Sequence, residues 1–436
     1  LISISKNRQA SLRTRLALGT ALATIAFGYG GRGAYAGTCT GGAGVYNCTG
    51  AAGADATQSL NGDGGGLSVT TSSGFGLAVG AYGSTAMVLT DTGAGGLSFN
   101  DTNPGGSAIT GFNRAINANN SGGGALTITT NGAVSNTTGS GASYNRGGIY
   151  ARNSAGAGDT TVTTNSTVTT TAGRGIEVNT LGSSGSLTIN ANAAVTVGAT
   201  GNAYNGIYAF AYSATSDITV TAGTVSGGSQ GIEATNNFNA STNIDVTVSG
   251  AVSGSSYGIH TQKAAGGTAN VTLNAGASVS GGGDAILIAS GASNTNTLTV
   301  NSGASITGSV RMFGNDNVIF NGGDISGVTT INAYSGTDSI TFTNSGGPQA
   351  VSGSQIVNFE NFTVGSGGNV SVGGTLDVNS VTVENGGILG GTGIINASVG
   401  VTDGTLGAGN SPGLLSIVGN LDLGVSSMQL DQPERG

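Results

Sequence analysis

Charged, aromatic, proline and cysteine residues are all scarce in this sequence. Among its 436 residues there are 4 Pro, 2 Cys, 1 His and no Trp, and charged residues make up only 7%, whereas an ordinary soluble domain has about 25%. Hydrophobic residues still make up 37%, and disordered chains combine low hydrophobicity with high charge. The composition therefore excludes a solvated, charge-rich disordered chain.

Glycine is the residue in excess. Its 84 copies disfavour an α/β enzyme, because each glycine in a helix interior costs up to about 1 kcal/mol relative to alanine. Residues 1–36 carry five basic residues and no acid, which leaves 7 basic against 20 acidic residues in the rest of the chain. This balance repels phosphate backbones, so nucleic acid is not expected as a partner.

The first 36 residues have the organisation of a secretory signal peptide. A basic segment from Lys6 to Arg15 precedes an apolar run from Leu16 to Phe27, which is too short and too interrupted by glycine to span a bilayer. The small residues of Ala34-Tyr35-Ala36 predict cleavage between Ala36 and Gly37. We therefore expect an exported protein, placed at the cell surface, in the outer membrane or outside the cell.

The two cysteines, Cys39 and Cys48, both follow the predicted cleavage point. In an oxidising compartment, two nearby thiols joined by a glycine-rich loop are expected to form a disulfide. We predict that this pair closes an N-terminal cap over residues 37–60. A metal site would need two more soft ligands, and His260 is the only histidine, so no metal or other cofactor is expected.

A repeat of about 27 residues runs from Gly122 to Val310, and a period of this length is typical of solenoids. Each repeat contains about three short strands of alternating pattern, separated by Gly, Ser and Asn. One such coil cannot bury its own apolar face, so the coils must stack. The sequence therefore predicts an all-β chain, a parallel β-helix over residues 61–382, whose core includes the ladder Ile149, Ile176, Ile207, Ile232, Ile259 and Ile286.

After Arg311 the period shortens to about 22 residues, as the segments beginning at Gly314 and Gly336 show. Each segment has an aspartate two residues later, Asp316 and Asp338. The Gly-x-Asp element is similar to calcium-binding nonapeptide repeats. Only two copies occur, without the Gly-Gly-x-Gly lead-in, so we expect these aspartates to form turns.

If the isoleucine ladder points inward, alternation turns the residues between its members outward. Aromatic and charged residues gather there although both are scarce in the chain, and we interpret them as a candidate ligand strip: Tyr150, Arg152, Glu177, Tyr208, Phe210, Glu233 and His260. Rigid Tyr and Phe rings on this strip would provide contact area for a host or matrix protein or glycan. His260 is expected to be solvated, without a carboxylate neighbour.

Residues 383–431 resemble the passenger-associated repeat of autotransporters. The resemblance rests on Val383–Gly393, Gly404–Gly413 and Leu415–Leu421, with Gly407-Ala408 where the family has Ala-Pro. It implies a type V secreted passenger domain with a right-handed β-helix, moved across the outer membrane by its own C-terminal β-barrel. No such barrel follows in residues 432–436, so we expect the sequence to be a partial one.

Enzyme activity is not expected. Glu177 and Glu233 lie two coils apart, about 10 Å, which is longer than glycosidase carboxylate pairs require. The Gly-x-Ser-x-Gly matches at Ser229, Ser256 and Ser411 lack the strand-to-helix context of a nucleophile elbow, and Ser229, Asp245 and His260 lie too far apart in the repeats for a triad. Adhesin-like binding is the preferred function; a polysaccharide-active enzyme and a purely structural stalk are the alternatives.

Overall fold

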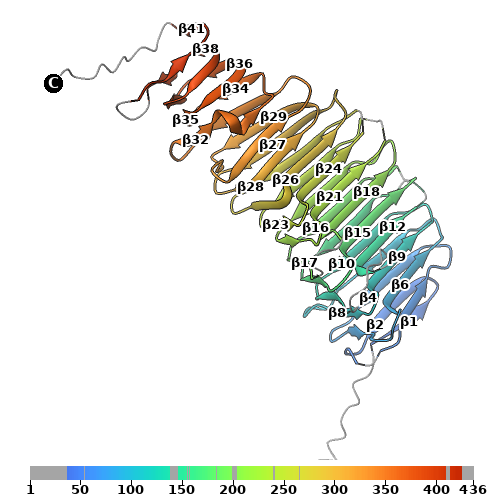
Figure 1. The fold of residues 1–436 in the computed structure, drawn as a ribbon. Helices are drawn as coiled ribbons and strands as arrows, with labels where there is room; N and C mark the ends of the chain where they lie inside the picture. The colour runs from blue at the N-terminus through green and yellow to red at the C-terminus, as the bar shows by residue number, and fades with distance from the viewer. Residues whose placement is uncertain are drawn as a thin grey trace, which may run out of the picture.

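The computed structural model describes residues 37–424 except 54, 138–145, 155, 157, 183, 199–203, 239–240, 265 and 409–412. Within these ranges the chain is a parallel β-helix, in which short strands follow one another around a coil and each coil pairs with the coils on either side (Figure 1). The single described helix is the 3-10 turn η1 (Gly353–Gln355), and no described helix is long and apolar enough to cross a membrane. The predicted all-β fold is confirmed.

The first sheet has 18 strands. Its strands are five or so residues long and alternate buried Leu, Ile, Val or Phe with Thr, Ser or Asn on the outside, as a half-buried strand requires. They are β1 (Thr38–Gly42), β2 (Val45–Thr49), β4 (Leu67–Thr71), β7 (Leu97–Asn100), β10 (Leu126–Thr130), β13 (Thr160–Thr164), β16 (Leu187–Ala191), β19 (Ile218–Ala222), β22 (Ile244–Val248), β25 (Ala269–Leu273), β27 (Thr295–Asn301), β29 (Asn315–Asn321), β31 (Ser339–Thr343), β34 (Asn361–Val364), β36 (Thr375–Val383), β38 (Ile394–Val401), β40 (Ser416–Ile417) and β41 (Leu421–Leu423).

The second sheet has 19 strands in two parallel ladders. A short ladder consists of β5 (Gly76–Ala78), β8 (Ala108–Gly111), β11 (Val134–Asn136), β14 (Val168–Thr170), β17 (Val195–Val197), β20 (Val225–Ser226) and β23 (Ala251–Gly254). The long ladder consists of β3 (Gln58–Asn61), β6 (Thr85–Asp91), β9 (Arg114–Asn120), β12 (Gly147–Asn153), β15 (Arg174–Leu181), β18 (Ile207–Tyr212), β21 (Gln230–Asn236), β24 (Tyr257–Lys263), β26 (Ser278–Ser290), β28 (Ser305–Met312), β30 (Val328–Ala333) and β33 (Ile356–Val357).

The coil shortens where the two ladders of the second sheet merge. The 13-residue strand β26 pairs with β23 through its first half and with β24 through its second. From there the register steps fall from 27 residues to 22, as in the pairing of Asn317 with Ser339. A third, four-stranded sheet then completes the narrower C-terminal coils: β32 (Gln349–Ser352), β35 (Asn369–Gly373), β37 (Ile388–Gly391) and β39 (Thr405–Leu406).

The predicted isoleucine ladder forms the core of the long ladder. Consecutive members pair in register from Ile149 on β12 to Ile286 on β26, and none is more than 1% exposed. Each isoleucine from Ile149 to Ile259 follows a glycine where the long-ladder strand begins, at a corner of the coil. A Cβ at Gly258 would lie 2.6 Å from the carbonyl oxygen of Ala285 on the next coil. The coils therefore approach too closely at this corner for any side chain, which explains the repeated Gly-Ile pair.

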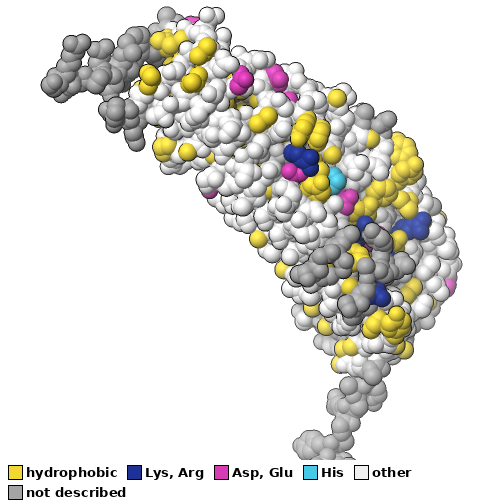
Figure 2. Space-filling view, in the orientation of Figure 1, with side chains coloured by type: hydrophobic (Ala, Val, Ile, Leu, Met, Phe, Trp, Pro, Cys, Tyr) yellow, Lys and Arg dark blue, Asp and Glu magenta, His cyan; other side chains and the backbone are white. Residues whose placement is uncertain are grey.

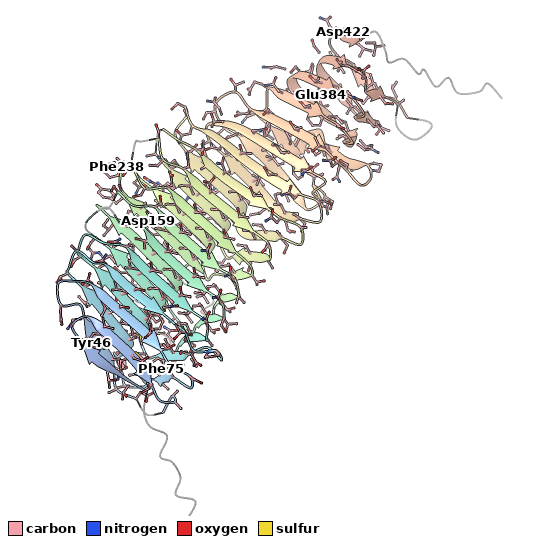
Figure 3. The ribbon with its side chains drawn as sticks, turned by 180° about the vertical axis from the view of Figure 1, so that it is seen from behind. Tyr46, Phe75, Asp159, Phe238, Glu384 and Asp422 are labelled. Carbon is pink, nitrogen blue, oxygen red and sulfur yellow. A yellow bond between two sulfur atoms is a disulfide. The ribbon has the colours of Figure 1, made fainter. Side chains whose placement is uncertain are left out.

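A disulfide-bonded hairpin lies at the N-terminal end of the β-helix, as predicted. β1 and β2 are antiparallel, with Cys39 opposite Cys48 and their sulfur atoms bonded. β2 then pairs in parallel with β4, so the hairpin covers the first edge of the sheet. Tyr46 on β2 marks this end in the rear view and Asp422 on β41 the other (Figure 3). Of the predicted cleavage pair only Gly37 is described; the signal peptide, Ser411 and the tail from 425 on lie outside the described residues.

Candidate functional site

The predicted ligand strip lies on the outward face of the long ladder. Register pairing places five of its residues in one column on successive strands: Tyr150, Glu177, Tyr208, Glu233 and His260. Arg152 and Phe210 belong to a second column two residues further along the strands, with Asn179 between them. All seven predicted residues are therefore brought together on one face.

The strip is less exposed than the sequence predicts. Arg152 is exposed, but the rings of Tyr150, Tyr208 and Phe210 are half-buried, and Glu177 is only 9% exposed. Strands in a ladder lie about 4.8 Å apart, so large side chains in register cover one another. The rings of Tyr150 and Tyr208 lie on the outward face, but an arginine covers one face of each ring.

Two arginines that the sequence analysis did not place on the strip lie against its tyrosines. The guanidinium carbon of Arg114 lies 3.9 Å from the centre of the Tyr150 ring, and that of Arg174 lies 3.7 Å from the centre of the Tyr208 ring. The negative face of an aromatic ring attracts a cation at this distance. Arg174 also forms an ion pair with Glu177, Nη1 to Oε1 at 2.9 Å.

An aromatic row crosses the strip along β18. Tyr208 stacks on Phe210 and Phe210 on Tyr212, with ring centres 6.1 and 6.3 Å apart. Phe238, which follows β21, meets Tyr212 edge-on at 4.9 Å. Tyr212 is 53% exposed. Alternate residues of one strand point to the same side, so the row could have been predicted by extending the pattern of Tyr208 and Phe210 by two residues.

His260 is half-buried beside a carboxylate, which corrects the expectation of a solvated histidine without one. β21 and β24 pair Glu233 directly with His260, and Glu233 accepts a hydrogen bond from the side-chain amide of Asn205. Burial lowers the pKa of His260; Glu233 opposes this shift, and Arg311 adds to it. Burial, with a smaller contribution from Glu233, also raises the pKa of Tyr208 to about 12. Both side chains are therefore neutral at neutral pH.

Arg311 continues the charged face on β28. Its guanidinium binds the carboxylate of Asp284 through Nε at 2.6 Å and Nη2 at 2.5 Å. This hydrogen bond, partly offset by burial, raises the pKa of Arg311. The result is a fixed ion pair at the C-terminal end of the strip.

The basic residues of the described β-helix lie on or beside the long ladder, and all but the buried, inward Lys263 are on its outward face. Between residues 37 and 424 there are six: Arg114, Arg146, Arg152, Arg174, Lys263 and Arg311. Five lie on the strands β9, β12, β15, β24 and β28, and Arg146 immediately precedes β12. Figure 2 looks onto this face and shows basic side chains and the histidine on it. The rest of the surface is largely Ser, Thr, Asn and Gly.

An open hollow of about 340 Å³ borders the strip and is lined by Gln262, Lys263, Ala289, Ser290 and Phe313 among others. The Lys263 side chain is buried, and its ammonium group donates hydrogen bonds to the backbone oxygens of Phe238, at 2.8 Å, and Ala264, at 3.4 Å. Burial lowers the pKa of Lys263. The hollow could not be predicted from the repeat pattern, because its residues come from four successive coils.

The triad of Ser229, Asp245 and His260 that the sequence disfavours is not assembled. Asp245 lies on β22 of the first sheet, where it accepts a hydrogen bond from Asn270, whereas His260 lies on the second sheet. The hydroxyl of Ser229 donates a hydrogen bond to that of Ser256 on the next coil, at 3.4 Å. Among the residues described, no group of three or more His, Cys, Asp or Glu is arranged to hold a metal ion.

Asp316 and Asp338 form part of a stack of acidic side chains beneath the first sheet. Asp338 accepts a hydrogen bond from the backbone N–H of Asp316, at 2.6 Å, and Glu360 accepts one from that of Asp338, at 2.7 Å. Both aspartates are 1% exposed. Burial, with the neighbouring carboxylate adding to it, raises the pKa of Asp316 to about 7 and that of Asp338 to about 6. These residues join successive coils. The prediction that both aspartates form turns is wrong for Asp316, which lies buried within β29, whereas Asp338 lies in the segment before β31.

Comparison with known proteins adds no relative. No family model matches the sequence, and no curated protein and no solved structure is significantly similar to it. The resemblance of residues 383–431 to the passenger-associated repeat therefore rests on those residues alone.

Proposed function

We propose that this chain is an exported autotransporter passenger that acts as an adhesin and binds an extended host or matrix ligand along the strip. The observation that carries this proposal is the gathering of four of the six basic residues of the described β-helix on or beside the neighbouring strands β9, β12 and β15, next to the Tyr208–Phe210–Tyr212 row of β18. In a chain with 7% charged and 5% aromatic residues, such a concentration is not needed to fold a solenoid. Export is supported by the predicted signal peptide and by the disulfide.

The arrangement suits binding better than catalysis. Ring contacts hold Arg114 and Arg174 in place, and Arg174 also forms an ion pair with Glu177. Side chains that are already ordered lose less entropy on binding. Glu177 and Glu233 lie on β15 and β21 with Tyr208 of β18 between them. Two strand spacings amount to about 10 Å, which is beyond the separations used by glycosidases.

A triple replacement tests the proposal. We expect Arg152→Ser with Phe210→Ser and Tyr212→Ser to weaken binding of the purified protein to cultured host cells or their matrix by at least about 30-fold, because truncating a true hot-spot residue costs about 2 kcal/mol or more. These side chains point outward, so the circular dichroism spectrum and the melting temperature should change little. Tyr150 and Tyr208 are left intact because Arg114 and Arg174 pack on them.

A matched control removes aromatic rings from another part of the surface. Tyr82 is 86% exposed and contacts Phe112, with ring centres 5.2 Å apart, in the loops before β6 and β9. Tyr82→Ser with Phe112→Ser should leave cell binding unchanged. A triple variant that folds normally and binds as tightly as the parent protein would favour the structural stalk instead.

A further inference from the structure

The basic side chains of the strip are concentrated at one end. Arg114 lies on β9, Arg152 on β12 and Arg174 on β15. Arg146 immediately precedes β12. The acids between residues 114 and 181 are Glu177, which pairs with Arg174, and Asp159, which precedes β13 of the first sheet. We call Arg114, Arg146, Arg152 and Arg174 the arginine face. With Glu177 included, its formal charge is +3, on a chain whose formal net charge is −8.

The geometry of the arginine face suits a ligand that carries several anionic groups. Arg114 and Arg174 occupy the same register position on β9 and β15, with Gly147 between them. Two strand spacings place their backbones about 10 Å apart. Arg152 is exposed on the intervening strand β12, and Arg146 is partly exposed at its start. Guanidinium groups bind carboxylate and sulfate-like oxygens through paired N–H donors.

The attraction between the arginines and an anionic ligand can outweigh repulsion by the net negative charge of the whole chain. At physiological salt the Debye length is about 8 Å, so acidic side chains on other faces are largely screened from a ligand held at the arginine face. Because these acids are screened, the choice between anionic polymers depends on the side chains that surround the arginines. The adjoining Phe210 and Tyr212 rings and the surrounding Ser, Thr and Asn side chains are suited to sugar rings and hydroxyl groups.

We propose that the arginine face binds an anionic polysaccharide, through the sulfate or carboxylate groups that recur along it. This inference rests on the proposed function, since it names the ligand class of the same strip. The polysaccharide would lie across β9, β12 and β15 with its anionic groups on the arginines and its sugar rings toward the aromatic row of β18.

The test measures binding of the purified, folded protein to heparin as a sulfated probe and hyaluronan as a carboxylated probe, with neutral dextran and single-stranded DNA for comparison. We expect heparin to bind, dextran not to bind, and DNA to bind at least about tenfold more weakly than heparin. Affinity for heparin should fall steeply between roughly 50 and 200 mM salt, because binding releases counterions.

Substitutions locate the site. Arg146→Ser with Arg152→Ser should weaken heparin binding at least about tenfold and reduce its salt dependence, whereas lysine at both positions should restore most of the affinity. Arg311→Ser removes a basic residue from the far end of the strip, where Asp284 already binds it, and should leave heparin binding unchanged. Equal losses in the two serine variants would overturn the assignment of the arginine face.

Three outcomes separate this inference from the proposed function. If the parent protein binds cells but neither heparin nor hyaluronan, the polysaccharide inference is wrong and the adhesin proposal stands. If DNA binds as tightly as heparin, the face is an unselective cation patch and the inference is also wrong. If the triple variant Arg152→Ser, Phe210→Ser and Tyr212→Ser keeps full cell binding, the proposed function itself fails.

Discussion

Ile259→Asp should lower the urea midpoint of the β-helix far more than Gln262→Asp, three residues along the same strand. Ile259 is fully buried between Ile232 and Ile286 of the neighbouring coils, and a buried carboxylate without a partner costs several kcal/mol. Gln262 is exposed between Thr235 and Ala289, with no acid next to it in the ladder. A surface change of this kind usually alters the free energy of unfolding by about 0.5 kcal/mol or less.

His260 is a poorer control position than Gln262, because an aspartate there would lie beside Glu233. If Ile259→Asp does not fold, Ile259→Ala serves instead, with an expected cost of about 2 to 5 kcal/mol from lost burial and the cavity left behind. The midpoint is measured by circular dichroism. Equal shifts for the buried and the exposed substitution would show that the isoleucine ladder does not form the core.

Acidification should stabilise the coils around β29 and β31. In the folded chain the pKa of Asp316 is raised to about 7 and that of Asp338 to about 6, mainly by burial, from an ordinary value of 3.8. The folded state therefore binds protons at these aspartates more tightly than the unfolded state does. The stabilisation that protonation contributes is complete below about pH 4 and is lost as the pH rises through 6 and 7. A shift of three pKa units corresponds to about 4 kcal/mol.

Local hydrogen exchange is the suitable measurement, because a long solenoid need not unfold in one step. After correction for the intrinsic rate, amides of β29 should be better protected at pH 5 than at pH 8. Asp316→Asn keeps an oxygen that can accept the Asn296 hydrogen bond but has no charge, so this variant should lose most of the pH dependence. Asp377→Asn, at an exposed position on β36, should keep it. Unchanged pH dependence in Asp316→Asn would contradict the assignment.

The N-terminal coils should respond to pH in the opposite direction. Asp101 follows β7 and is buried, which alone would raise its pKa, but hydrogen bonds from Thr71, Ser107 and Asn131 outweigh burial and lower it. A carboxylate whose pKa is lowered in the folded state stabilises the fold at pH values above its ordinary pKa. This stabilisation is lost on acidification. Comparison of β7 with β29 in one exchange experiment therefore separates the two groups of carboxylates.

The isoleucine spacing was sufficient to predict the coil, its core and the strip. A 27-residue period places Ile232, Ile259 and Ile286 in register, and alternation then determines which neighbours point outward. The glycine corner at Gly258 could not be predicted in the same way, because the clash that requires glycine is with the backbone of the next coil.

Side-chain burial on the strip was harder to predict than side-chain direction. Arg114 and Arg174 precede the aromatic column by several residues, and their contact with Tyr150 and Tyr208 depends on the register between coils. Lys263 belongs to an inward position that Asn236 and Ser290 occupy on neighbouring coils. Alternation places this lysine inside, but the backbone oxygens that bind its ammonium group come from a turn the pattern does not predict.

Oxidative footprinting of the protein bound to a fixed layer of cultured animal cells tests most directly whether the strip is the binding face. The bound and free proteins are exposed to hydroxyl radicals, and oxidation of each aromatic ring is measured by mass spectrometry. The account predicts that Phe210 and Tyr212 are oxidised more slowly in the bound protein, while Tyr46 on the N-terminal hairpin and Tyr82 outside the strip are oxidised at the same rate in both states. Binding that protects Tyr46 or Tyr82 and leaves Phe210 and Tyr212 unprotected would contradict it.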